Sequence, residues 1–116
     1  MPTGIDHVEA ALAYIERARE QAGALESVGA EAVARMEAAA ALLQETKERF
    51  YLKTRVGVPF ARRCEGAAQA LAALLTEQGA GAESDAQEQL DAALQALEKA
   101  VKTLDERSRM QGMAIT

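Results

Sequence analysis

The chain has 116 residues, 27 of them alanine, and a net charge of −5, whereas Leu, Ile, Val and Phe together supply 23 residues. This length fits one domain but not two, and the few large apolar side chains predict a thin core that favours self-association, most often as a homodimer. The negative charge argues against duplex nucleic acid as the main partner, because phosphate binding needs a broad basic face.

The first predicted helix spans residues 4–24. Thr3, with Asp6 three residues later, resembles a capping box in an acidic form, and apolar residues then recur at intervals of three and four. This spacing places them on one face of a helix, which comprises Val8, Leu12, Ile15, Ala22 and Leu25.

The second predicted helix spans residues 28–56 and follows a weak boundary signal. Gly23 and Gly29 flank Ser27, a residue type typical of a helix N-cap. The alternative is one long helix over residues 5–56, which would give a three-helix arrangement. We prefer the break, because the long helix would place charged residues and a glycine in its apolar seam.

The third predicted helix spans residues 59–78. Gly57 suits the position after a helix C-cap, and Pro59 suits the first position of the next helix, where its missing N–H costs nothing. We therefore expect two helical hairpins joined near these residues. Gly79 and Gly81 predict the end of this helix.

The fourth predicted helix spans residues 84–111. Ser84 and Gln87 form a capping box, and the most regular apolar stripe of the chain follows, with Leu90, Leu94, Leu97, Val101 and Leu104. Together the four helices predict a single all-α domain over residues 1–116, an antiparallel up-down four-helix bundle.

The sequence predicts neither a membrane segment nor a secretory signal. Its apolar runs are shorter than the roughly 18–20 residues that cross a bilayer, and residues 1–12 lack a basic region followed by a continuous apolar one. The single cysteine, Cys64, excludes an intrachain disulfide. We therefore expect a cytoplasmic protein, and the alanine content suggests a bacterial source.

Few residues offer catalytic or metal-binding chemistry. His7 is the only histidine, so one chain has no Ser–His, Cys–His or Glu-x-x-His di-iron arrangement, and we interpret it as solvated or edge-packed. Cys64 is in phase with apolar residues and is interpreted as a buried hydrophobe; alternatively, Arg62 and Arg63 beside it would make a reactive thiol. We predict no enzyme, no metal and no cofactor.

The strongest functional signal is a segment that we call the basic junction, residues 47–63. It holds three of the four aromatic residues and six of the thirteen Lys and Arg, and its charge is +5, whereas residues 1–46 and 64–116 each sum to −5. Most of its cations suit the C-terminal end of a helix. Arg62 and Arg63 do not, because the predicted boundary places them in the opening turns of the third helix, where carboxylates are favoured.

We therefore predict a protein-interaction module, such as an adaptor, a chaperone-like protein or a structural subunit, that contacts an acidic protein partner through the basic junction. Its predicted contact residues are aromatic anchors and arginines, namely Phe50, Tyr51, Arg55, Phe60, Arg62 and Arg63. The alternative function is a small-ligand or anion-binding bundle with Arg62 and Arg63 at a helix N-terminus. In a purely structural interpretation, the same residues close and stabilise the end of the bundle.

Overall fold

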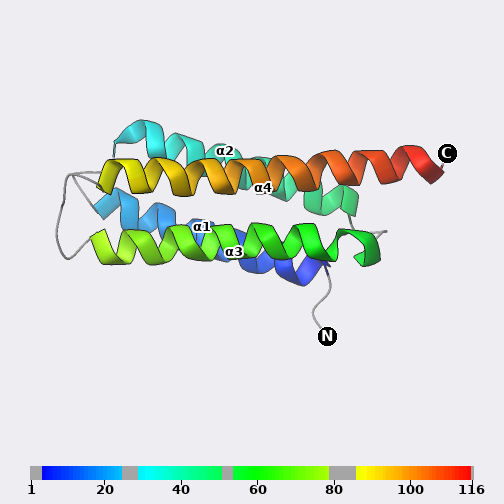
Figure 1. Cartoon of the computed structure of the whole chain (residues 1–116), viewed down its shortest axis with the longest axis horizontal. Helices are drawn as coiled ribbons and strands as arrows, with labels where there is room; N and C mark the ends of the chain where they lie inside the picture. The colour runs from blue at the N-terminus through cyan, green and yellow to red at the C-terminus, as the bar shows by residue number, and fades with distance from the viewer. Residues whose placement is uncertain (1–3, 25–28, 51–53, 79–85, 116) are drawn as a thin grey trace.

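The computed structural model of the chain is all-helical over the residues it describes, which are 4–24, 29–50, 54–78 and 86–115 (Figure 1). This confirms the predicted fold class. The four helices are α1 (Gly4–Ala24), α2 (Ala30–Phe50), α3 (Thr54–Gln78) and α4 (Ala86–Ile115).

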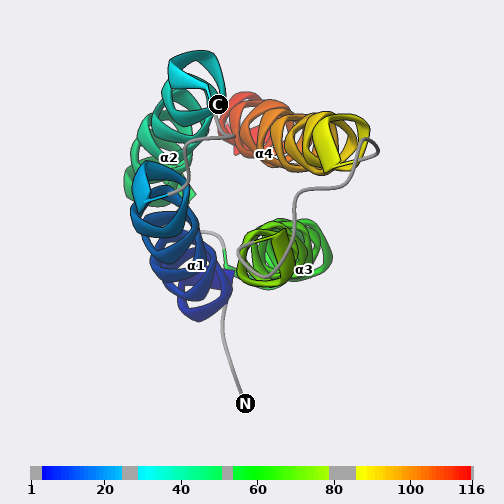
Figure 2. The same cartoon turned by 90° about the vertical axis from the view of Figure 1, so that its left-hand side faces the viewer.

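The helices run alternately in opposite directions and form a four-cornered bundle (Figures 1 and 2). α1 packs against α2 and α3, and α4 packs against the same two helices, so the order around the bundle is α1, α2, α4, α3. α2 and α3 are therefore at opposite corners although they are consecutive in the chain. As a result, the two parallel pairs, α1 with α3 and α2 with α4, are direct neighbours.

The break between the first two helices is confirmed. α1 ends at Ala24 and α2 begins at Ala30, so the alternative of one long N-terminal helix is wrong. The predicted bounds of the first helix agree with those of α1. α4 continues to Ile115, a turn beyond the predicted end of the fourth helix.

The predicted boundary at Gly57 and Pro59 is wrong. α2 ends at Phe50 and α3 begins at Thr54, so both residues lie inside α3. The first four N–H groups of a helix have no partner within it, and a proline at the sixth position therefore removes only one early hydrogen bond. That loss is small beside the packing of the rest of α3 against α1 and α4.

Small side chains fill much of the bundle core. α1 contributes Ala11 and Ala18 and α3 contributes Ala61 and Ala68, all with no exposed surface, and α1 and α3 form the most extensive helix pair. Alanine allows two helix axes to approach closely, because interaxial distance depends on the side chains at the contact. Among the described residues, α4 supplies more of the larger buried apolar side chains than any other helix, and the members of its predicted stripe, Leu90, Leu94, Leu97, Val101 and Leu104, are all buried.

Candidate functional site

The structure describes half of the residues predicted to contact a partner. Phe60, Arg62 and Arg63 lie on α3 within its described part. The side chains of Phe50 and Arg55, and the whole of Tyr51, lie outside the described residues, so their role stays a prediction.

The two arginines are not at a helix N-terminus. α3 begins at Thr54, so Arg62 and Arg63 are its ninth and tenth residues and lie in its third turn. The favourable effect of a helix N-terminus on anions is lost beyond the first turn. The alternative function as an anion receptor at a helix start therefore loses its structural basis at these residues.

Phe60 and Arg63 instead line an open groove between α3 and α4, of about 310 Å³. Three of its lining residues are alanines, so its floor is apolar and shallow, and Phe60 is half-buried at one end. We call it the α3/α4 groove, and its lining comprises Phe60, Arg63 and Ala67 from α3 and Ala96, Lys99, Ala100 and Thr103 from α4.

The ring of Phe60 attracts cations from both walls of the groove. The guanidinium carbon of Arg63 lies 5.7 Å from the ring centroid, and that of Arg107, on α4, lies 5.3 Å from it. Cation–π contacts at exposed sites contribute about 0.5–1 kcal/mol each, so the ring helps to hold two like charges at one end of the groove.

Arg62 and Arg63 have different environments although they are adjacent in sequence. Phe60, Arg63 and Ala67 have the 3-4 spacing of a single helix face, and that face is turned towards α4. Arg62 is exposed and is not among the residues that line the groove. The two arginines are adjacent in the sequence, but the structure brings only Arg63 to the groove.

The cations of the α3/α4 groove have no carboxylate partner among the residues that the structure describes. Among the described side chains, Arg63, Lys99 and Arg107 form no ion pair, and neither do the cations Arg17, Arg62 and Lys102 outside the groove, whereas four other cations are paired. The paired cations are Arg19 with Glu16 and Glu37, Arg35 with Asp91 and Glu98, Lys47 with Glu9, and Arg109 with Asp105.

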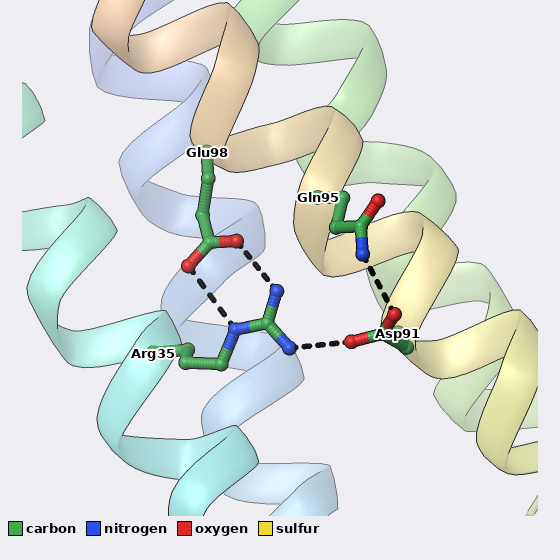
Figure 3. A network of polar contacts seen from close by, with 4 residues as sticks. All are labelled: Arg35, Asp91, Gln95 and Glu98. Carbon is green, nitrogen blue, oxygen red and sulfur yellow. Dashed lines mark hydrogen bonds and ion pairs between the residues drawn. The ribbon is translucent and has the colours of Figure 1, made fainter.

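Arg35 is an example of a cation that is paired with carboxylates in this bundle (Figure 3). Its guanidinium, on α2, donates to both carboxylate oxygens of Glu98, with Nε 3.1 Å from Oε2, and its Nη1 donates to Oδ1 of Asp91 at 2.7 Å. Gln95 donates to the other Asp91 oxygen at 2.8 Å. These hydrogen bonds, with Glu98 the larger contributor, raise the pKa of Arg35 further above its usual range. The cluster therefore links α2 to α4, and its two carboxylates compensate the positive charge of Arg35, so this cation is not free for an anionic ligand.

The polar groups near the other end of α2 and α4 also satisfy one another. Thr46 is fully buried, and its hydroxyl shares its proton between the Leu42 carbonyl oxygen at 2.8 Å and Asp105 Oδ1 at 3.1 Å. Arg109 Nε donates to Asp105 Oδ2 at 2.9 Å. Buried polar groups of this kind fix the register of two helices, and we assign this cluster a structural role.

His7 is buried between α1 and α3 rather than solvated. Its Nδ1 lies 3.1 Å from Oε2 of Glu65, which is 58 residues away in the sequence, and its Nε2 is buried without a hydrogen-bond partner among the described residues. Glu65 follows Arg62 and Arg63 closely in the sequence, but its hydrogen-bond partner is His7 on α1. No spacing in the sequence indicates this contact.

Cys64 lies in the core, which favours its interpretation as a small buried hydrophobe. It has no exposed surface, and burial raises the pKa of its thiol to about 12. The thiolate is the reactive form, and its population near neutral pH is therefore much smaller than for an ordinary exposed cysteine. The positive charge of its arginine neighbours does not offset this desolvation.

We expect Cys64 to resist alkylation in the folded protein. Maleimide at pH 7.5 should leave the native chain unlabelled over an hour and should label it within minutes in guanidinium chloride, as measured by intact mass spectrometry. Rapid labelling of the native chain would support the reactive-thiol interpretation instead.

Other kinds of site have little support in the described part of the chain. It contains no group of three or more His, Cys, Asp or Glu side chains placed to hold a metal ion, and none of its helices is long and apolar enough to cross a membrane. Comparisons with protein-family models, curated proteins and solved structures find no match to the chain. The geometry and charge of the α3/α4 groove are therefore the best basis for a function.

Proposed function

We propose that this protein is a non-enzymatic interaction module, and that it binds an acidic segment of a partner protein in the α3/α4 groove. The observation that supports the proposal is the combination of an apolar floor with three cations, Arg63, Lys99 and Arg107, that have no carboxylate partner among the described residues. A partner that supplies carboxylates would satisfy these cations and cover the apolar floor in one step.

The apolar and charged parts of the groove have different roles in this proposal. Burial of apolar surface contributes about 25 cal/mol per Å², so most of the affinity comes from contact with Phe60 and the alanines. An exposed ion pair contributes only about 0–1 kcal/mol, and the cations therefore act mainly on the association rate, the orientation and the choice of an acidic partner.

The positions of the two most reactive side chains support a non-enzymatic function. His7 is buried against Glu65 and Cys64 is buried in the core, so neither faces the α3/α4 groove. The homodimer and the cytoplasmic location predicted from the sequence stay predictions.

We expect the double variant R63E/K99E to lose its acidic partners. The control R62E/K102E changes the charge by the same amount at exposed positions outside the groove, where Lys102 faces the α2/α4 side of the bundle. Each reversal in the groove replaces an attraction with a repulsion, so partner capture should fall at least tenfold. The measurement is quantitative mass spectrometry of proteins captured from a lysate of the native host.

The control variant and the melting temperatures distinguish loss of binding in the groove from a general effect of charge or from unfolding. If R62E/K102E retains the partners of the wild type and both variants melt within a few degrees of it, the loss belongs to the groove. Equal capture by R63E/K99E and the wild type would contradict the proposed function.

A further inference from the structure

We infer that the occupant of the α3/α4 groove is an amphipathic helix whose flanks are acidic, which would lie along α3 and α4 as a fifth helix. This inference rests on the proposed function and deepens it, because it gives the partner a secondary structure and a charge pattern. It follows from the lining of the groove, from its length and from the places of its cations.

The lining favours a helix over an extended segment. A helix satisfies its own backbone hydrogen bonds, whereas an extended segment needs partners for its N–H and C=O groups along its whole length. The groove offers few such partners, because among the described residues that line it Thr103 is the only polar one apart from the cations, and both of its walls are helices. An extended segment bound here would leave buried polar groups unsatisfied, at a cost of about 1–3 kcal/mol each.

The floor of the groove is shaped for the ridge of another helix. Ala67, Ala96 and Ala100 present only methyl groups, and a row of side chains on an incoming helix can fit between the two walls, as in helix-in-groove recognition. Leu74, half-buried and one heptad after Ala67, extends the same apolar row along α3. From Phe60 to Leu74 this row is about 20 Å long, which corresponds to an incoming helix of roughly four turns.

The cations set the charge pattern that the incoming helix needs. Arg63 lies on the α3 wall, and Lys99 and Arg107 lie on α4, eight residues or about 12 Å apart along the helix. A matching helix would have Asp or Glu seven or eight residues apart on one flank, at least one acid on the other, and small apolar residues between them.

A designed peptide tests this geometry directly. The probe is a fluorescein-labelled 21-residue peptide with Ala and Leu at heptad positions a and d and Glu at e and g. The control peptide has the same composition in an order that does not separate apolar from acidic residues. By fluorescence anisotropy we expect the wild-type protein to bind the amphipathic peptide at least tenfold more tightly than the control peptide, with a rise in peptide helicity by circular dichroism. Equal affinity for both peptides, or binding of neither, would overturn the inference.

Two single substitutions test the place of binding. Ala96→Trp fills the groove at an exposed position, and Ala92→Trp adds the same side chain at an exposed position of α4 that does not line it. Affinity for the amphipathic peptide should fall at least tenfold with Ala96→Trp and change less than twofold with Ala92→Trp. If R63E/K99E loses its captured partners but Ala96→Trp binds the peptide normally, the helical occupant is wrong and the proposed function stands. If neither change has an effect, both are wrong.

A second copy of this chain is the other acidic occupant that the experiment can reveal. Sedimentation of the wild type and of R63E/K99E without peptide gives their oligomeric states. Oligomers that dissociate only in R63E/K99E would overturn the inference in favour of self-association through the groove.

Discussion

Leu97→Ala is expected to lower the free energy of unfolding by about 2–5 kcal/mol, the largest loss among the single substitutions considered for this protein. Leu97 has no exposed surface and lies in the apolar stripe of α4. Removal of its isobutyl group loses transfer free energy and leaves a cavity that the surrounding helices fill only in part. Because domains of this size are stable by only about 5–15 kcal/mol, this loss would be a large fraction of the total stability.

The measurement is urea unfolding monitored by far-ultraviolet circular dichroism, with the wild-type slope retained. Leu42→Ala is the matched control, because Leu42 is half-buried on α2 and already touches solvent. Its loss should be less than half of that for Leu97→Ala. A loss below 1 kcal/mol for Leu97→Ala would contradict the prediction that Leu97 lies at the centre of the core.

The parts of the fold that could be predicted are those that depend on periodicity. The stripe of α4 extends from Leu90 to Leu104 at 3-4 spacing, and every one of its members is buried. The break between α1 and α2 was also predictable, because two glycines flank Ser27 there and one long helix would place charged residues and a glycine in its apolar seam. In both cases the information lies within one helix or one turn.

The boundary between α2 and α3 shows where local signals fail. Gly57 and Pro59 have the residue types that commonly end one helix and begin the next, yet both lie inside α3. A glycine in a helix costs about 1 kcal/mol and an early proline removes one hydrogen bond. The stabilisation from packing of the rest of α3 is larger than these costs. The size of this stabilisation cannot be predicted from a single sequence.

The sequence predicted only part of the candidate site, because the rest of the site also depends on how the helices pack. Phe60 and Arg63 were predicted because they stand out in composition, but Lys99 and Arg107 belong to a segment with ordinary composition. Their importance depends on which flank of α4 faces α3. That in turn depends on the order of helices around the bundle, which places α2 and α3 at opposite corners and which the spacing of residues does not specify.

Ala68→Leu is expected to destabilise the bundle by about 1–3 kcal/mol, although it adds apolar volume to a thin core. Ala68 has no exposed surface, and it lies between Glu65, which contacts His7 of α1, and Thr76, which contacts Gln21 of α1. A leucine there would have to enter the α1/α3 seam, where helices that approach through alanine have no spare space.

The exposed neighbour Ala70 gives the matched control, because Ala70→Leu adds the same atoms on the solvent side of α3 and should change stability by less than 0.5 kcal/mol. Chemical denaturation of the two variants separates two explanations of how a chain with 27 alanines folds. If close approach of small residues stabilises the bundle, only Ala68→Leu weakens it. If the core is loosely filled, Ala68→Leu strengthens it, and the close contact of α1 with α3 is then not what holds the bundle together.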